Sequence, residues 1–327
     1  MKKIKVAFIY HKNNIFLSGN HFDNTYYHFY INALKRNETL DVTYVPTGDI
    51  FDASELKDKF DIILLWENSE FGMPNELVGL DELNLPVITK VSDPFRASKS
   101  IKLHKKWKID HYFWMCHEDF FYELYPRKFK YKTIIFGLEP SLYQNVKPFN
   151  ERIKNKILNS GAVGNQKPLS KILNDIRRPK WNALRVYYLR TIVNNLPYVD
   201  YFPTLQNEFV GDKYPLLLEK YQTSIAACTV TTVAKMWEIP AAGSMTFLEV
   251  NGKNNVESFG FKDQENAVFI NEKNYKEKFQ EYLETYEDPK WKKIAENGRK
   301  FVMENLNNDK AVESLVELMQ TALNEKD

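Results

Sequence analysis

The hydrophobic and polar positions of this chain alternate between short apolar runs and longer amphipathic segments. Residues 6–10 are apolar throughout, which is typical of a strand buried on both faces of a parallel sheet. Turn residues or helical segments separate such runs, as expected for right-handed crossover units of strand, helix and strand. In the first half of the chain, the pattern predicts further strands at residues 42–45, 62–66, 87–91, 111–115 and 133–136.

The alternation restarts after a polar segment with a proline at residues 147–152. A strand at residues 156–160, a glycine-containing loop at 161–166 and a helix at 168–176 are predicted next. Later strands are predicted at residues 199–202, 224–228, 245–250 and 267–270. We therefore predict an α/β protein with two consecutive α/β domains, at residues 1–148 and 149–308. The last segment is helical, with apolar residues at Ala311, Val312, Leu315, Val316, Met319 and Leu323.

The composition excludes several classes of protein. The 327 residues are 43% hydrophobic and 27% charged, which is typical of a globular protein in water. A net charge of +2 gives no general attraction to nucleic acid or to an anionic membrane, and no stretch reaches the length of a membrane span. The two cysteines, Cys116 and Cys228, lie in different halves, which favours free thiols in a reducing compartment. We expect a cytoplasmic protein without stable membrane insertion.

The segment KMWEIPAAG at residues 235–243 carries the clearest candidate chemistry. It places Glu238 among apolar residues, where a carboxylate is costly unless something hydrogen-bonds to it. A ribose diol would serve, because a carboxylate accepts from both hydroxyls. The alternative is an ordinary amphipathic helix whose Glu238 points to water.

Four segments together resemble the group-1 glycosyltransferases of the GT-B architecture, and their spore-maturation-protein-like branch. IFGLEPSLY at residues 135–143 resembles the interdomain run P-x-G-V-D-x-x-x-F, and ILNSG at 157–161 resembles the first strand and glycine turn of the nucleotide domain. KMWEIPAAG resembles the branch signature R-x-F-E-x-x-A-x-G. KKIAENGR at residues 292–299 resembles the I-A-x-x-G-R helix.

The resemblance implies two Rossmann-like domains that face each other across a cleft, with residues 309–327 forming a helix that packs back on the N-terminal domain. It implies that Glu238 binds the ribose, that Lys235 faces the diphosphate and that Gly243 matches the glycine of the signature. Many group-1 enzymes carry a second glutamate eight positions before the first. Val230 occupies that place here, a departure that the branch shares.

Four more residues are candidates for binding the nucleotide, because a diphosphate favours helix starts, cations and close backbone approach. Thr231 and Thr232 precede Lys235 and are expected to open its helix, with an ordinary helix cap as the alternative. Gly161 lies in the first turn of the second domain, and Lys167 follows on the same loop, where it is either a phosphate ligand or a solvated side chain. The sequence lacks a G-x-G-x-x-G fingerprint in this loop, which disfavours an NAD-type cofactor.

Two residues of the first domain are candidates for catalysis. Asp93 follows a predicted buried strand and is placed to act as a base or to orient the acceptor hydroxyl. The alternative is that Asp93, which precedes a proline, caps a turn. His21 lies in the polar loop after the first strand. The histidines show no spacing typical of metal ligands, so no metal site is predicted.

We therefore predict a glycosyltransferase that moves a sugar from a nucleoside-diphosphate sugar to a hydroxyl of a glycan or another acceptor. The resemblance implies that it needs neither metal nor cofactor and retains the anomeric configuration. One alternative is a non-catalytic protein that binds nucleotide sugars or glycans. Another is a glycosyltransferase that acts on modified nucleic acid through the basic clusters at residues 102–108 and 177–180. Such clusters are usually solvated faces, so nucleic acid is disfavoured.

Overall fold

The computed structural model describes residues 2–14, 23–177, 182–203 and 208–326. They form two compact units. The first comprises the described residues of Met1–Gly19, Tyr26–Ile135 and Asn308–Asp327, and the second those of Asn20–Thr25 and Phe136–Asn307. The second unit thus begins before the boundary expected at residue 148. Tyr143 explains this, because its ring is buried and its carbonyl accepts a hydrogen bond from Arg299 at 2.6 Å.

The first unit is built on a parallel sheet with the strand order β2-β1-β4-β6-β7-β8. The strands are β1 (Ile4–His11), β2 (Leu40–Thr47), β4 (Ile62–Leu65), β6 (Val87–Lys90), β7 (His111–Trp114) and β8 (Lys130–Thr133). From β1 the chain runs to the edge strand β2 and then returns to β4 on the other side of β1. The strand predicted at residues 133–136 is wrong in position. The edge strand β8 is only partly buried, so it does not form an apolar run.

The helices of this unit include the last one of the chain. They are α1 (Asp23–Tyr27), whose first residues are assigned to the second unit, the π-helix η2 (His28–Ala33), α2 (Leu34–Arg36), α3 (Ala97–Lys106), α4 (Glu118–Leu124) and α11 (Asn308–Asn324). The short elements are η3 (Ala53–Leu56), η4 (Pro94–Arg96) and the strand pair β3 (Ile50–Asp52) and β5 (Glu76–Val78). Helix α11 packs beside η2 and buries its apolar stripe, and Lys132 binds Glu317 of α11 at 2.8 Å.

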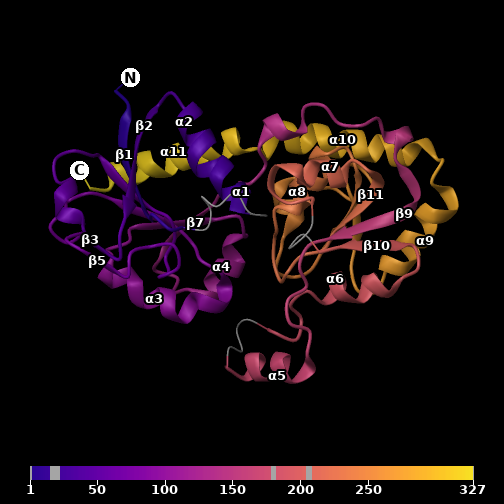
Figure 1. The fold of residues 1–327 in the computed structure, drawn as a ribbon, viewed down its shortest axis with the longest axis horizontal. Helices are drawn as coiled ribbons and strands as arrows, with labels where there is room; N and C mark the ends of the chain where they lie inside the picture. The colour runs from indigo at the N-terminus through magenta and orange to yellow at the C-terminus, as the bar shows by residue number, and fades with distance from the viewer. Residues whose placement is uncertain (1, 15–22, 178–181, 204–207, 327) are drawn as a thin grey trace. The chain divides into compact units, whose positions relative to one another are not determined.

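The second unit repeats this plan with the strand order β10-β9-β11-β12-β13. The strands are β9 (Ile153–Ser160), β10 (Val199–Phe202), β11 (Tyr221–Ala226), β12 (Met245–Glu249) and β13 (Val268–Ile270). The α-helices are α5 (Pro168–Arg177), α6 (Tyr188–Ile192), α7 (Tyr214–Leu218), α8 (Lys235–Ala241), α9 (Tyr275–Thr285) and α10 (Pro289–Asn305). The short helices are η5 (Pro140–Tyr143), η6 (Phe149–Glu151), η8 (Val193–Asn195), η9 (Gly211–Lys213) and η10 (Val256–Phe259). Figure 1 shows α5 apart from the helices that cover the sheet.

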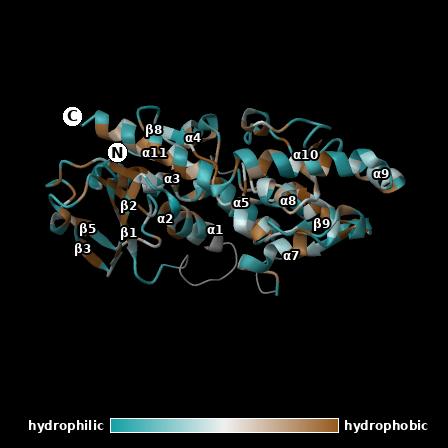
Figure 2. Ribbon diagram, turned by 90° about the horizontal axis from the view of Figure 1, so that it is seen from above, coloured by the Kyte–Doolittle hydropathy of each residue, from teal (hydrophilic) through white to brown (hydrophobic). Residues whose placement is uncertain are grey.

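The core of each unit lies between its sheet and the helices that cover it. Strands β4, β6, β11 and β12 are buried at every position. The apolar run of β4 predicts this, whereas β11 also buries Gln222, Thr223 and Ser224. Figure 2 shows hydrophobic colours in strands such as β1, whereas helices such as α10 alternate between hydrophobic and hydrophilic colours. The predicted α/β class with parallel sheets is confirmed. Of the helices described, none is long and apolar enough to cross a membrane.

Candidate functional site

The second sheet changes its strand order between β9 and β11, because the chain leaves β9 for the edge strand β10 and then returns to its other side. In open α/β sheets, ligands bind outside the carboxyl ends of the strands at such a switch point. At this edge β9 ends at Ser160 and β11 ends at Ala226, and the next strand, β12, ends at Glu249. The loops after β9 and β11 carry most of the residues that the sequence proposed for nucleotide binding.

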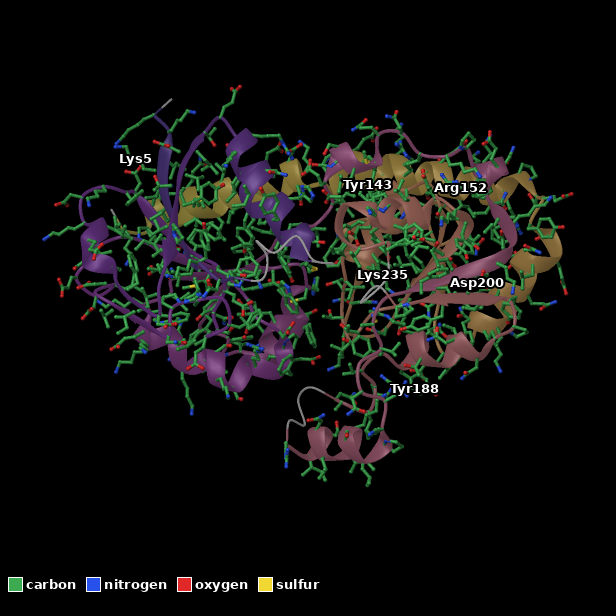
Figure 3. The ribbon with its side chains drawn as sticks, viewed as in Figure 1. Lys5, Tyr143, Arg152, Tyr188, Asp200 and Lys235 are labelled. Atoms are coloured by element: carbon green, nitrogen blue, oxygen red, sulfur yellow. The ribbon has the colours of Figure 1, made fainter. Side chains whose placement is uncertain are left out.

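Lys235 is the first residue of α8, and its side chain is buried at this edge of the sheet (Figure 3). Its ammonium donates a hydrogen bond to the carbonyl of Ser160, the last residue of β9, at 2.9 Å. Burial away from water, and then the nearby positive charge of Arg190, hold the pKa of Lys235 well below its usual range. Lys235 therefore lies at the switch point, but its ammonium is joined to the backbone and is not exposed.

Glu238 follows one helical turn later and is partly exposed. Within the part of the chain that the structure describes, its carboxylate has no hydrogen-bond or ion-pair partner. Loss of water raises the pKa of Glu238 to about 8, although Lys235 lowers it. Burial raises the pKa values of Tyr143 and Tyr214, and the negative charge of Glu238 raises them further. The two phenols are therefore electrostatic neighbours of Glu238. The carboxylate is thus free to accept hydrogen bonds from a ligand.

Two further charged residues complete this site, and the sequence reading missed both. Arg190 of α6 is buried and donates to the carbonyls of Ala162 and Ala227, each at 2.7 Å, which ties together the loops after β9 and β11. The carboxylate of Glu249 accepts a hydrogen bond from the backbone N–H of Cys228 at 2.8 Å. We call Arg190, Lys235, Glu238 and Glu249 the switch cluster. Glu249 lies one residue before the end of the strand predicted at 245–250, a position that would have indicated it, whereas Arg190 lies in no motif.

The two candidate glycines have different surroundings. Gly161 has a φ of +108°, and a Cβ there would lie 3.1 Å from a guanidinium nitrogen of Arg190. Its backbone conformation and its packing both favour glycine beside the switch cluster. Gly243 has a φ of +74° and lies in the turn from α8 into β12, at the opposite edge of the sheet. A Cβ there would lie 2.9 Å from Arg152, so the structure gives Gly243 a role in this turn and places it away from the switch point.

The prediction that Thr231 and Thr232 open the helix is wrong, because α8 begins at Lys235 with Ala234 as its cap. Both threonines are buried in the loop after β11, and the hydroxyl of Thr231 donates to the carbonyl of Lys253 at 3.0 Å. This contact holds the loop away from a helical first turn. Lys167 is exposed just before α5, on the loop that follows Gly161.

In the first unit, Asp93 lies at the carboxyl edge of the sheet, three residues after the end of β6. It occupies the cap position of η4, where its backbone carbonyl accepts a hydrogen bond from the N–H of Arg96 at 2.8 Å, but its side chain makes no capping hydrogen bond. Asp93 is exposed, yet the surrounding protein raises the pKa of its carboxyl by removing water, against the lowering effect of Lys90. The other catalytic candidate, His21, lies outside the described residues.

A buried ion pair lies at the same carboxyl edge of the first sheet. Lys90, the last residue of β6, binds Glu67 at 2.9 Å, and the hydroxyl of Ser69 donates to the other carboxylate oxygen. Burial lowers the pKa of Lys90, but the charge of Glu67 and then the phenol of Tyr26 raise it above its usual value overall. The ammonium also lies 5.1 Å from the ring centre of Trp66. The sequence reading missed this pair because Lys90 falls inside a predicted buried strand.

The described residues contain no group of three His, Cys, Asp or Glu side chains that would hold a metal ion. Cys116 and Cys228 are both buried and free. Burial raises the pKa of both thiols, so neither is an activated nucleophile.

No protein-family profile matches the chain, and no curated protein matches it in sequence. Solved structures match it over nearly its whole length. Anabaena HepE in complex with UDP and glucose has 10% identity and a TM-score of 0.55, with 97% of this chain and 100% of that chain covered. A glycosyltransferase from Rickettsia africae has 14% identity and a TM-score of 0.59, with 99% of both chains covered.

An α-glucosyltransferase in complex with UDP and a 13-mer DNA is similar too, with 10% identity, a TM-score of 0.59 and coverage of 97% of this chain and 100% of that one. At such low identity the likeness shows a common fold. All three are glycosyltransferase structures with the GT-B architecture. The chain therefore has the α/β fold of the GT-B glycosyltransferases.

Proposed function

We propose that the chain is a glycosyltransferase that transfers a sugar from a nucleoside-diphosphate sugar to a hydroxyl of an acceptor. The observation that carries this proposal is the carboxylate of Glu238, which has a raised pKa and no partner among the described residues. It lies near the switch point of the second sheet, where open α/β folds bind their ligands. The similar solved structures, which contain UDP and glucose or UDP and DNA, support the same ligand class.

On the donor side, each member of the switch cluster has a separate task. Glu238 accepts hydrogen bonds from the ribose hydroxyls, which supply the partners that its carboxylate lacks. Arg190 adds positive charge next to the loop after β9, and a bound diphosphate would raise the lowered pKa of the neighbouring Lys235 and so favour its charged form. Gly161 allows the backbone of this loop to approach the phosphates closely.

On the acceptor side, Asp93 is the proposed base or orienting group, because it is exposed at the carboxyl edge of the first sheet and its carboxyl has a raised pKa. The proposed reaction uses no bound metal and no cofactor and retains the anomeric configuration, as in the group-1 enzymes that the sequence resembles. The proposed acceptor is a glycan or another hydroxyl compound, the proposed branch is the spore-maturation-protein-like one, and the proposed compartment is the cytoplasm.

One observation favours a second candidate, a protein that binds a nucleotide sugar without transferring it. Val230 stands where many group-1 enzymes carry the glutamate that contacts the donor sugar, and its side chain is buried and apolar. Turnover measurements separate this candidate from the enzyme.

The decisive experiment is a panel of nucleoside diphosphates and their sugars tested by thermal shift, followed by assays of nucleotide release with a broad set of acceptors. A nucleotide present at a hundred times its dissociation constant stabilises the protein by about 2.7 kcal/mol. We expect a diphosphate to stabilise the protein more than the corresponding nucleoside. If no nucleotide shifts the melting temperature, the proposal is wrong. If nucleotide sugars bind but release no nucleotide with any acceptor, the binding-protein candidate is the better account.

A further inference from the structure

Helix α5 presents an apolar face to solvent. Its residues include no buried side chain, and four aliphatic ones are strongly exposed: Leu169 (75%), Ile172 (45%), Leu173 (51%) and Ile176 (73%). The spacing of three, four and seven residues places all four on one side of the helix. Since globular proteins seldom leave such a contiguous stripe uncovered, this face indicates an interaction site.

The opposite face of α5 is attached to the rest of the unit. The ammonium of Lys171 donates to the carbonyl of Val186 at 3.4 Å, and the carboxylate of Asp175 accepts from the backbone N–H of Ala183 at 2.9 Å. Lys171 and Asp175 are four residues apart and share the polar side of the helix. These contacts turn the aliphatic stripe outward, away from the segment at residues 183–186.

The charge around the helix is strongly positive. In the sequence, residues 167–180 contain one acidic residue and five basic ones: Lys167, Lys171, Arg177, Arg178 and Lys180. This segment therefore carries more positive charge than the entire chain, whose net charge is +2. Lys167 and Arg177, at the two ends of the stripe, are both exposed.

We propose that α5 docks on the surface of an anionic phospholipid membrane and lies in the plane of the interface. The aliphatic stripe enters the boundary between headgroups and acyl chains, while Lys167 and Arg177 contact lipid phosphates. Ten residues rise only about 15 Å along a helix, a length that suits shallow insertion and not a membrane span. The proposal is independent of the proposed transferase function, because it concerns binding and not turnover.

Two other partners fit this face less well. A nucleic acid would match the positive charge, but its phosphate backbone would leave the four aliphatic side chains in water. A second copy of the chain would cover the aliphatic stripe, but it would also bring two strongly basic segments together. Of these three partners, the anionic lipid surface alone complements both the charge and the apolar stripe.

The test is flotation of the full chain with vesicles of phosphatidylcholine alone or mixed with phosphatidylglycerol. We expect binding to the mixed vesicles, weaker binding to phosphatidylcholine alone, and weakening as salt rises. The double variant Leu169→Ser/Ile176→Ser should lower the partition coefficient by at least about tenfold. Because α5 has no buried residues, this variant should keep the melting temperature of the wild type. Leu216→Ser in α7 is the matched control, because Leu216 is 50% exposed elsewhere in the same unit, and it should bind like the wild type.

Three results would overturn the proposal. The first is a wild-type chain that fails to float with the mixed vesicles. The second is a double variant that floats as well as the wild type. The third is a wild-type chain that forms a dimer and binds no vesicles, together with a double variant that is a monomer. The stripe would then be an interface between copies of the chain.

Discussion

The carboxyl edges of the two sheets have the same architecture, but their buried charged side chains have different kinds of partner. At the first edge, Glu67 and Lys90 bind each other at 2.9 Å, and both side chains are almost completely buried. At the second edge, Lys235 donates to a backbone carbonyl, and the carboxylate of Glu238 has no partner within the described residues. The first arrangement is complete without a ligand, whereas the second leaves a carboxylate available for one.

The pKa values express the same contrast. Glu67 raises the pKa of Lys90 and so stabilises its charge despite burial, whereas burial raises the pKa of Glu238 to about 8 and so disfavours its charge. An unpaired carboxylate in such surroundings costs free energy that hydrogen bonds from a ligand would offset. The comparison indicates that the first edge is held by its own side chains, whereas the second keeps a carboxylate that the hydroxyls of the proposed ribose would satisfy.

The largest expected effect comes from breaking the pair at the first edge. Lys90→Met leaves the Glu67 carboxylate buried without its partner, which should lower the free energy of unfolding by about 3–5 kcal/mol. Denaturant unfolding at neutral pH measures this, with fluorescence and circular dichroism compared because the two units can unfold separately. Lys262→Met is the matched control. Its partner Glu265 lies 3.2 Å away on the surface, so the loss should stay below about 1 kcal/mol. Similar losses in the two variants would show that the buried pair has no special role.

The second-largest effect is expected on turnover, from a change at the carboxyl edge of the first sheet. If Asp93 acts on the acceptor, Asp93→Asn should lower the turnover of the wild-type reaction by roughly 100-fold, as for other acid–base groups. Nucleotide should still raise the melting temperature of this variant, because the proposed nucleotide site lies in the other unit. Turnover equal to that of the wild type would remove Asp93 from the mechanism without affecting the donor site.

The third-largest effect is expected on nucleotide affinity, from replacing the carboxylate of Glu238 at the edge of the second sheet. Glu238→Gln should weaken binding of the nucleoside diphosphate by on the order of 1–3 kcal/mol, the cost typical of losing charged hydrogen bonds. Calorimetry at pH 9 gives the comparison, since the wild-type carboxyl with a pKa of about 8 is then mostly ionised. A variant that binds as tightly as the wild type at this pH would contradict the assignment of Glu238 to the ribose.

The smallest effect is the pH dependence of that binding. Below a pKa of about 8, Glu238 in the free protein mostly holds a proton, which must leave before a carboxylate can accept two hydrogen bonds. Affinity should therefore increase by about tenfold between pH 7 and pH 9. Glu238→Gln removes this dependence and leaves that of Lys235 and of the nucleotide, which both proteins share, so the difference between the two proteins reports Glu238. Parallel profiles for both proteins would show that Glu238 does not titrate with binding.

The sequence predicted those elements correctly whose burial leaves a direct pattern of apolar residues, and it misplaced elements that lack such a pattern. Strands such as 6–10 and 62–66 were predicted because burial on both faces of a parallel sheet leaves a continuous apolar run. The edge strand β8 was misplaced because it lacks that run. The opening of the helix at Thr231 was predicted wrongly, since local capping rules do not include the distant carbonyl of Lys253 that binds its hydroxyl.

The sequence by itself determined the α/β class, the two parallel sheets and the candidate segment around Glu238, because periodicity and local motifs are properties of neighbouring residues. Only the tertiary structure decided the electrostatic partners. Lys90 meets Glu67 from 23 positions away, and Lys235 meets the carbonyl of Ser160 from 75 positions away. The crossover connections of each sheet bring these strand ends together, so the partners of Lys90 and Lys235 depend on the topology and not on their sequence neighbours.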